Sequence, residues 1–214
     1  NMLKLLDKKE LRNFSIFIVW LINISGFFGI LSDQKDFFLS SSPYVLTLTL
    51  FLLVINNSTE KRFLISLLLI FLLGLIVEIL GVNYSLFFGE YQYGDNLGIK
   101  IYDVPIVIGL NWVLLIILTG NFAHKIFPKP IIPKVLIGSA MMIFLDLLIE
   151  ISAPKLDYWE FTIHPVPFSN YLWWFIFSVL FHLIYQSNTN KEFIVSTNIL
   201  VVHFLFFGML AVFL

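Results

Sequence analysis

The sequence predicts an all-α polytopic membrane protein, a single transmembrane domain over residues 1–214 with about seven helices and a cytoplasmic N-terminus. Hydrophobic residues make up 59% of the chain and charged residues only 13%, which is typical of membrane proteins. Apolar runs approaching the ~20 residues that cross a ~30 Å hydrocarbon core recur along the whole chain. None of them alternates apolar and polar residues as barrel strands do, so the spans are predicted to be helices.

The first two apolar runs are residues 14–31 and 43–56. The first lacks a small-residue cleavage site and further runs follow it, so we expect a helix rather than a removed signal peptide. The second is shorter than a typical span, and whether it crosses the membrane is left open. If it does not cross, both ends of the chain lie on the same side.

The other five runs are long enough to span. The run at 63–81 carries Glu78 near its end, and the run at 131–151 carries Asp146 and Glu150. The connections between runs are too short to form a second domain. In order, the five runs are residues 63–81, 104–123, 131–151, 169–186 and 192–214.

Lysine and arginine are unevenly divided between the two sides of the predicted bundle. Only Lys35, Lys100 and Lys155 fall on the side away from the N-terminus. The positive-inside rule therefore places the N-terminus in the cytoplasm and, with seven helices, the C-terminus outside. A bacterial inner membrane is expected, because outer membranes hold barrels. The ten basic residues of the cytoplasmic side are Lys4, Lys8, Lys9, Arg12, Lys61, Arg62, Lys125, Lys129, Lys134 and Lys191.

Three carboxyl groups, those of Glu78, Asp146 and Glu150, fall inside predicted helices. A carboxylate in hydrocarbon costs roughly 2.5–3.5 kcal/mol, so such a residue usually faces the bundle interior and marks a functional site. Asp146 and Glu150 are four residues apart and share one helix face. Both helices run outward in this topology, so all three carboxyls are expected at a similar depth near the outer surface.

Two polar loops, residues 82–103 and 152–168, are predicted to cover this cluster. The first contains the stretch FFGEYQYGDNLGIKIYDVP, with three tyrosines and three glycines between apolar runs. The second has prolines that restrict its backbone and aromatic rings typical of a membrane interface. Asn111 and Trp112 lie about two turns into the next helix, which enters from the same side, and reach a comparable depth.

Each carboxyl also has a purely structural interpretation. Glu78 and Glu150 lie near helix ends, where they could reach interfacial water. Asp146 is about one turn deeper, which favours a functional role. In a dry pocket one member of a close carboxyl pair tends to hold a proton, so the pair supplies an acid beside a base. His164 is solvated in the simplest interpretation, although a histidine beside carboxyls could shuttle protons.

The chain lacks the signals of common cofactor, metal and nucleic-acid sites. It has no cysteine and a net charge of -1, so neither thiolate chemistry nor a nucleic-acid partner is expected. No Walker loop, dinucleotide fingerprint, serine elbow or HExxH motif is present. His182 and His203 lie within helices with no second ligand at metal spacing. We therefore expect no cofactor and no metal.

Two segments, residues 78–112 and 146–173, resemble the membrane family of carotenoid biosynthesis proteins that includes carotenoid 1,2-hydratases such as bisanhydrobacterioruberin hydratase. The first segment has the family's Glu, its Phe-Gly-x-Tyr-x-Tyr run, and its Val-Pro before a helix with Trp. The second has an Asp helix, a Trp loop and Pro-x-x-Asn. The matching residues are Glu78, Gly81, Phe88, Gly89, Tyr91, Tyr93, Leu97, Gly98, Val104, Pro105, Trp112, Asp146, Glu150, Trp159, Pro167, Asn170 and Trp173.

The resemblance implies a carotenoid 1,2-hydratase, a hydro-lyase that needs no cofactor. Such an enzyme takes a linear carotenoid from the bilayer lipids and adds water to its terminal double bond, giving a tertiary alcohol. Tyr84 and Ser85 stand where the family often has Thr-Gly, and Glu150 and Ile151 where it often has Asp-Pro. These differences leave the exact carotenoid open.

The roles expected from this resemblance are catalytic for the three carboxyls. Asp146 is the hypothetical general acid, and Glu78 or Glu150 orients the attacking water as a base. The tyrosine-rich loop is expected to act as a lid over a pocket fed from the bilayer. The expected substrate-binding residues are Tyr91, Tyr93, Asn111, Trp112, Trp159, His164 and Asn170.

Three other functions remain open at this stage. A carotenoid cyclase or isomerase would protonate the same double bond but would not add water, so its product would have the mass of the substrate. A proton-coupled carrier would also use intramembrane acids, but these would be staged across the bilayer, and no inverted repeat is visible. A structural or lipid-binding subunit would give the carboxyls no role in proton transfer to a substrate.

Overall fold

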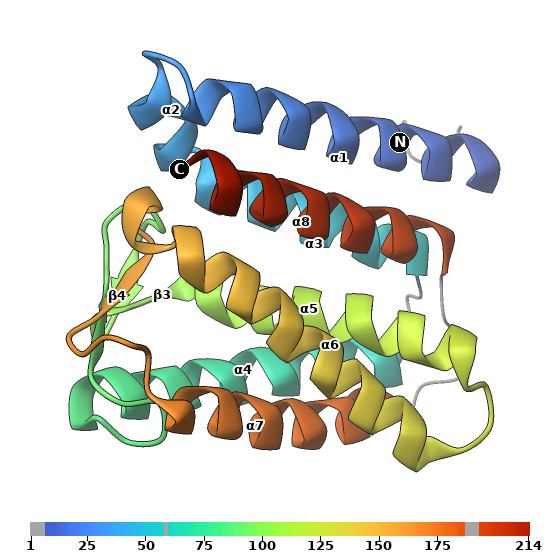
Figure 1. Cartoon of the computed structure of the whole chain (residues 1–214). Helices are drawn as coiled ribbons and strands as arrows, with labels where there is room; N and C mark the ends of the chain where they lie inside the picture. The colour runs from blue at the N-terminus through green and yellow to red at the C-terminus, as the bar shows by residue number, and fades with distance from the viewer. Residues whose placement is uncertain (1–6, 58–59, 187–192) are drawn as a thin grey trace.

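The computed structural model describes residues 7–57, 60–186 and 193–214, and in this part of the chain near-parallel helices form one bundle (Figure 1). Six of these helices are long and apolar enough to cross a membrane. They are α1 (Lys8–Ile30), α4 (Lys61–Tyr84), α5 (Ile106–Ile126), α6 (Ile131–Ser152), α7 (Phe168–Gln186) and α8 (Ile194–Phe213). The prediction of an all-α polytopic membrane bundle is confirmed. Three of the residues named in the sequence analysis lie outside the described part of the chain: Lys4, Lys191 and residue 192, the first of the predicted run 192–214.

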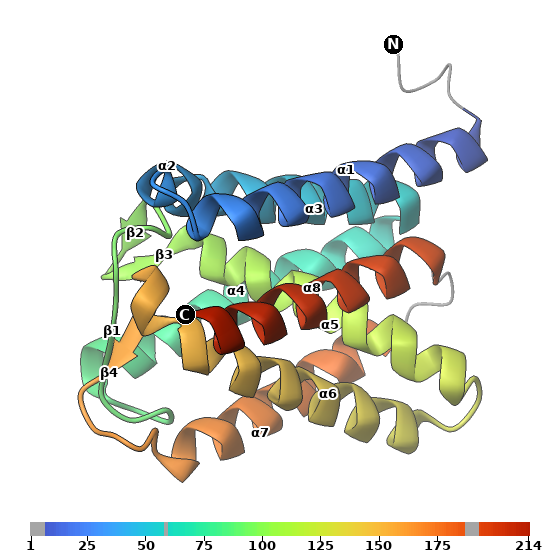
Figure 2. The same cartoon turned by 45° about the horizontal axis from the view of Figure 1, so that its top comes forward.

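The short second run forms α3 (Ser42–Asn57), which follows the short helix α2 (Lys35–Ser40). Its 16 residues rise about 24 Å, less than the ~30 Å of a hydrocarbon core. Even so, α3 packs against α1 and carries the chain from the end of the bundle with α2 to the end where α4 begins (Figures 1 and 2). With α3 included, seven of the described helices run the length of the bundle.

Helix α5 is the centre of the bundle. It packs against α3, α4, α6, α7 and α8, and the residues from Trp112 to Thr119 are all almost fully buried. A helix that is buried on every side must be apolar all round. Every residue from Val113 to Leu118 is apolar. The predicted run began at residue 104, but α5 begins at Ile106 because Val104 and Pro105 form a strand instead.

The four short strands found among the described residues lie at one end of the bundle, together with α2 (Figures 1 and 2). Strand β1 (Tyr91–Tyr93) pairs antiparallel with β4 (Trp159–Phe161), and β2 (Lys100–Ile101) pairs antiparallel with β3 (Val104–Pro105). The β1–β4 register places Tyr91 opposite Phe161 and Tyr93 opposite Trp159. The two polar loops of the sequence are therefore joined to each other by a strand pair.

Asp157 strengthens the join between these loops. It follows the short 3-10 turn η2 (Pro154–Leu156), and its Oδ2 accepts from the backbone N–H groups of Asp95 at 2.8 Å and Asn96 at 3.2 Å. The Gly94 N–H donates to the Tyr158 carbonyl at 3.0 Å. A Cβ atom on Gly94 would overlap the Asp157 side chain and backbone. Glycine at position 94 is thus required by the close approach of the second loop.

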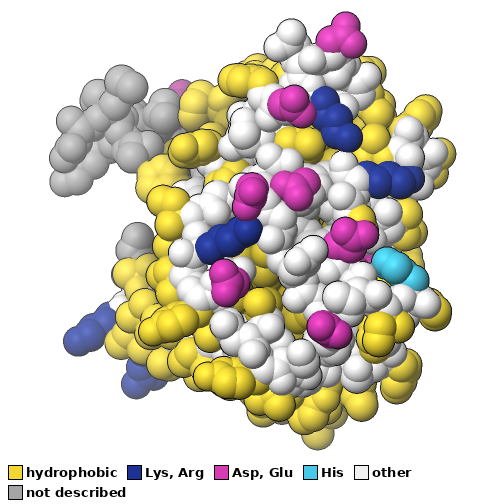
Figure 3. Space-filling view, turned by 90° about the vertical axis from the view of Figure 1, so that its left-hand side faces the viewer, with side chains coloured by type: hydrophobic (Ala, Val, Ile, Leu, Met, Phe, Trp, Pro, Cys, Tyr) yellow, Lys and Arg dark blue, Asp and Glu magenta, His cyan; other side chains and the backbone are white. Residues whose placement is uncertain are grey.

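The outer face of this end of the bundle is polar and mostly acidic, with hydrophobic side chains around its margin (Figure 3). Its clearest ion pair joins Lys100 Nζ to Asp95 Oδ1 at 2.8 Å. The hydrogen bond and charge of Lys100 lower the pKa of the Asp95 carboxyl. Asp95 is 96% exposed, so this pair adds little to stability. The exposed acids of the loops at this end are Asp33, Asp36, Glu90, Asp95, Asp103, Asp157 and Glu160.

We expect this acidic end to face away from the cytoplasm, which single-cysteine labelling can test because the chain contains no cysteine. Asp33 and Lys129 are exposed at opposite ends of the bundle. In right-side-out membrane vesicles, Asp33→Cys should react with an impermeant maleimide, whereas Lys129→Cys should react only after permeabilisation. The reverse pattern would invert the topology, and labelling of both variants in sealed vesicles would contradict an odd number of spans between residues 33 and 129.

Candidate active site

Three intramembrane carboxyls meet at one small cavity beneath the paired loops. Glu78 comes from α4, and Asp146 and Glu150 come from α6. The cavity measures about 20 Å³, which is room for about one water molecule. Five of the seven predicted substrate-binding residues line it with the carboxyls: Tyr91, Tyr93, Asn111, Trp159 and Asn170. The structure thus brings together residues that are up to 92 positions apart in the chain.

Glu78 is only 1% exposed and is held by three donors. Its Oε2 accepts from the hydroxyls of Tyr91 at 2.6 Å and Tyr93 at 2.8 Å. Its Oε1 accepts from the indole N–H of Trp112 at 2.9 Å. Because all three neighbours donate, the carboxyl is bound as an acceptor, an arrangement that suits a fixed negative charge.

The two tyrosines reach Glu78 because of the strand in which they lie. Residues i and i+2 of a strand point to the same face, so β1 directs both phenol rings toward the bundle. Gly81, one turn after Glu78, makes room for Tyr91 and for the neighbouring Phe88. A Cβ atom there would come within 2.8 Å of the Tyr91 hydroxyl and 2.7 Å of the Phe88 ring.

The buried loop tyrosines stay protonated. Burial is the main cause that raises the pKa values of Tyr91 and Tyr93 well above 10, and the nearby charge of Glu78 raises them further. A phenol with a raised pKa keeps its O–H through neutral and moderately alkaline pH. Both hydroxyls therefore remain available as donors to Glu78 over the range in which the protein would work.

Trp112 supports Glu78 rather than lining the cavity. Its ring is fully buried and stacks on Trp174 of α7, with centroids 4.1 Å apart and planes 15° apart. Gly74 of α4 allows this placement, because a Cβ atom there would lie 2.9 Å from the Trp112 ring. The indole that orients Glu78 is thus itself fixed between three helices.

Asp146 is 2% exposed and differs from Glu78 in its hydrogen bonding. Among the described residues its Oδ2 has no hydrogen-bond partner, and neither does Nδ2 of the neighbouring Asn170. The two side chains interact electrostatically without meeting hydrogen-bond geometry. Both line the small cavity. A buried acceptor and a buried donor that face one cavity form a site for a polar guest such as water.

Glu150 lies one turn beyond Asp146 and is less buried. Its Oε1 accepts from the indole N–H of Trp159 at 3.0 Å. Trp159 belongs to β4, and its position is set by pairing with Tyr93 in β1. The carboxyl pair on α6 is therefore connected through Trp159 to the same loops that hold Glu78.

His164 is placed apart from the other predicted residues. It is exposed in the connection between β4 and α7 and lines neither of the cavities described in this section. The cavity wall also contains three residues that the sequence did not predict: Ile108, Phe161 and Trp174. The inward direction of Trp174 is not visible in the sequence, because it depends on the packing of α7 against α5.

The structure contains a second, larger cavity that the sequence did not predict. It measures about 400 Å³ and is mainly apolar. Ile108, Asn111 and Trp159 line both cavities, so the two adjoin each other. Its only signal in the sequence is the set of polar residues within predicted spans that line it: Asn23, Ser25, Thr49, Asn111 and His203. Such residues tend to mark sites, but single hydroxyls and amides are too common in membrane helices to predict a cavity.

The geometry does not form a metal site within residues 7–57, 60–186 and 193–214, where no three His, Cys, Asp or Glu side chains are grouped closely enough to hold an ion. The arrangement instead offers proton-transfer chemistry. Glu78 is held by three donors, Asp146 has an oxygen without a hydrogen-bond partner among the described residues, and Glu150 lies beside it. With aromatic side chains, they surround a space for one small polar molecule.

Residues 42–214 match the family model described as carotenoid biosynthesis protein. This stretch contains the helices from α3 onward, and α1 and α2 precede it. No curated protein and no solved structure matches the chain. Because the family model covers most of the sequence, the chain belongs to the carotenoid biosynthesis protein family.

Proposed function

We propose that the protein is a hydratase that adds water to the terminal carbon-carbon double bond of an acyclic carotenoid. Membership in a carotenoid biosynthesis family supports a carotenoid as the substrate. The observation that carries the proposal is the water-sized cavity bordered by three carboxyls and adjoining a larger apolar cavity. Hydration of an alkene needs an acid, a water and a base at one place, and a hydrocarbon substrate needs an apolar surface beside them.

Asp146 is the proposed general acid. Its unpartnered Oδ2 transfers a proton to the less substituted alkene carbon, so the π electrons form a new C–H bond. The positive charge is then on the more substituted carbon, a tertiary cation. Water in the small cavity donates an oxygen lone pair to this carbon and forms the C–O bond.

Glu150 is the proposed base. It accepts the proton that the added water loses, and the product is a neutral tertiary alcohol. Glu150 and Asp146 are four residues apart on one helix face, so a proton can return from Glu150 to Asp146 through the next water molecule. The net reaction consumes one alkene and one water and leaves both carboxyls in their starting states.

Glu78 has a different proposed role. Three donors already occupy its oxygens, so it suits electrostatic stabilisation of the cation better than proton transfer. The aromatic residues Trp159, Trp174 and Phe161 line the same cavity, and aromatic rings attract a cation. This assignment narrows the choice of base, which the sequence left between Glu78 and Glu150, to Glu150.

The cavity supports a hydratase over the other functions that use intramembrane acids. A cyclase must keep water away from the cation, whereas here the carboxyls border a space of water size. A proton-coupled carrier needs polar groups staged across the membrane, whereas all three carboxyls lie at the loop-covered end.

Replacing Asp146 should abolish the reaction. We expect a bacterium that accumulates lycopene and expresses the wild-type chain to form pigments heavier by one or two waters. Asp146→Asn keeps the shape but not the acid, so product formation should fall roughly 100-fold or more. Chromatography with mass spectrometry measures the products, and protein levels are checked in isolated membranes.

The matched control for this loss is Glu160→Gln, which removes an exposed carboxylate of the loops and should leave turnover unchanged. Full turnover by Asp146→Asn would refute its role as the acid. A new pigment with the mass of lycopene would indicate a cyclase or isomerase instead.

Loss of one donor to Glu78 should weaken both the fold and the reaction. Tyr91→Phe and Tyr93→Phe each remove one charge-assisted hydrogen bond, which should lower the free energy of unfolding by about 1–3 kcal/mol. Turnover should fall while the product stays the same. Thermal unfolding in detergent and product yield in membranes measure the two effects.

Tyr44→Phe is the matched control for the tyrosine variants, because Tyr44 is 77% exposed on α3. It should change neither stability nor yield. If both loop variants behave like Tyr44→Phe, the hydrogen bonds to Glu78 do not contribute as proposed.

A further inference from the structure

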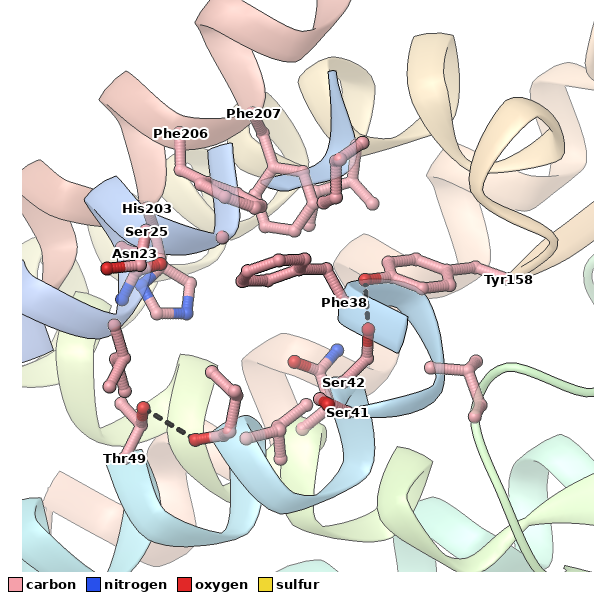
Figure 4. A pocket seen from close by; sticks show the side chains of 18 of the residues that line it. Asn23, Ser25, Phe38, Ser41, Ser42, Thr49, Tyr158, His203, Phe206 and Phe207 are labelled. Atoms are coloured by element: carbon pink, nitrogen blue, oxygen red, sulfur yellow. Dashed lines mark hydrogen bonds between the residues drawn. The ribbon is translucent and has the colours of Figure 1, made fainter. Parts of the chain in front are cut away.

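The 400 Å³ cavity is built from both ends of the chain. Helix α1 contributes Asn23, Ser25 and Gly26, α3 contributes Thr49, and α8 contributes His203, Phe206 and Phe207. Figure 4 shows Asn23, Ser25 and His203 at one end of the cavity and Tyr158 with Ser42 at the other, with Phe38 between them. The Tyr158 and Ser42 hydroxyls are 2.7 Å apart. The cavity is therefore elongated, with polar groups at its two ends.

The shape and lining of this cavity suit a linear hydrocarbon. Its volume is within the range of 300–1,000 Å³ that is typical of ligand sites. Phe37, Phe38, Phe206 and Phe207 all line it, and flat aromatic faces pack well against a conjugated chain. It is partly open to the exterior, and α1, which forms one of its walls, exposes apolar side chains such as those of Phe17 and Phe28. A lipid-dissolved ligand can thus reach it from the bilayer.

The Tyr158 end of the cavity leads to the carboxyls. Trp159 donates a hydrogen bond to Glu150. Like Ile108 and Asn111, it lines both cavities. A chain lying in the large cavity would therefore place its terminus against these three residues, directly beside the small cavity. This is the position that protonation by Asp146 requires.

We propose that the large cavity binds the end segment of a linear isoprenoid polyene, which enters from the bilayer and lies between α1, α3 and α8. This inference rests on the proposed hydratase function and identifies where its substrate is held. The wall formed by α1 and α2 precedes the stretch that matches the family. The proposed catalytic carboxyls belong to the matched stretch, whereas α1 and α2, which lie outside it, contribute eight of the 22 residues that line the large cavity.

Gly26 offers a direct test of the cavity. It lines the cavity on α1, and a Cβ atom there would lie 3.6 Å from the Phe206 ring. Alanine fits at that distance, but the larger side chain of Gly26→Leu must occupy space within the cavity. Gly208 on α8 is the matched control, because a Cβ atom there meets nothing within 4 Å and the residue does not line the cavity.

The experiment is a titration of purified protein in detergent with lycopene, followed by circular dichroism in the visible absorption band. Lycopene is achiral, so a signal in this band reports binding in a fixed chiral site rather than partition into micelles. The wild type and Gly208→Leu should show the signal with similar affinity. Gly26→Leu should bind roughly 10-fold more weakly or worse, with an unchanged helical signal in the far ultraviolet.

The same titration separates the cavity from the chemistry. Asp146→Asn should bind lycopene as the wild type does, although it forms no hydrated product. Binding that Gly26→Leu weakens, combined with a wild type that forms no hydrated product, would support the cavity and refute the hydratase. No induced signal from the wild type, or equal affinity of Gly26→Leu and Gly208→Leu, would overturn the cavity as the binding site.

Discussion

The structure depends on how a membrane bundle accommodates buried carboxylates. Insertion of one acidic side chain at the centre of a membrane helix costs roughly 2.5–3.5 kcal/mol, and a hydrogen bond to a charged group returns about 1.5–3 kcal/mol. Three donors to Glu78 therefore offset part of the cost of its burial. Two of these donors come from β1 and the third from α5, so the same bonds attach the outer loop to the helices.

The loops that cover the site are ordered by the groups they cover. Tyr91 and Tyr93 point inward to Glu78, and Trp159 in the paired strand points to Glu150. The strand pair between β1 and β4 joins these contacts into one unit, and Asp157 adds two backbone hydrogen bonds at its edge. A loop joined in this way excludes bulk water from the carboxyls while leaving space for one small molecule.

The two adjoining cavities divide the requirements of the proposed reaction between them. A carotenoid end needs a long apolar surface that is reached from the bilayer, and the large cavity supplies it between α1, α3 and α8. Proton transfer needs a few polar groups of fixed direction, and the small cavity supplies them from α4, α6 and the loops. Trp159 borders both spaces and is bonded to Glu150, so the position of the substrate and the state of the base are physically connected.

The sequence alone determined the fold class, because the length and apolar character of a span follow directly from the thickness of the bilayer. It also determined that Glu78, Asp146 and Glu150 belong to one site, since carboxyls within spans have few alternatives to the bundle interior and their depth follows from helix direction. Only the tertiary structure decided which groups each of these residues contacts. Tyr91, Tyr93 and Trp112 turned out to hold Glu78, and His164 to lie exposed at the surface, because hydrogen-bond partners depend on the register of two loops about 70 residues apart. The large cavity was likewise decided by tertiary packing, because the distance between α1, α3 and α8 depends on side chains of helices far apart in the chain rather than on any local pattern.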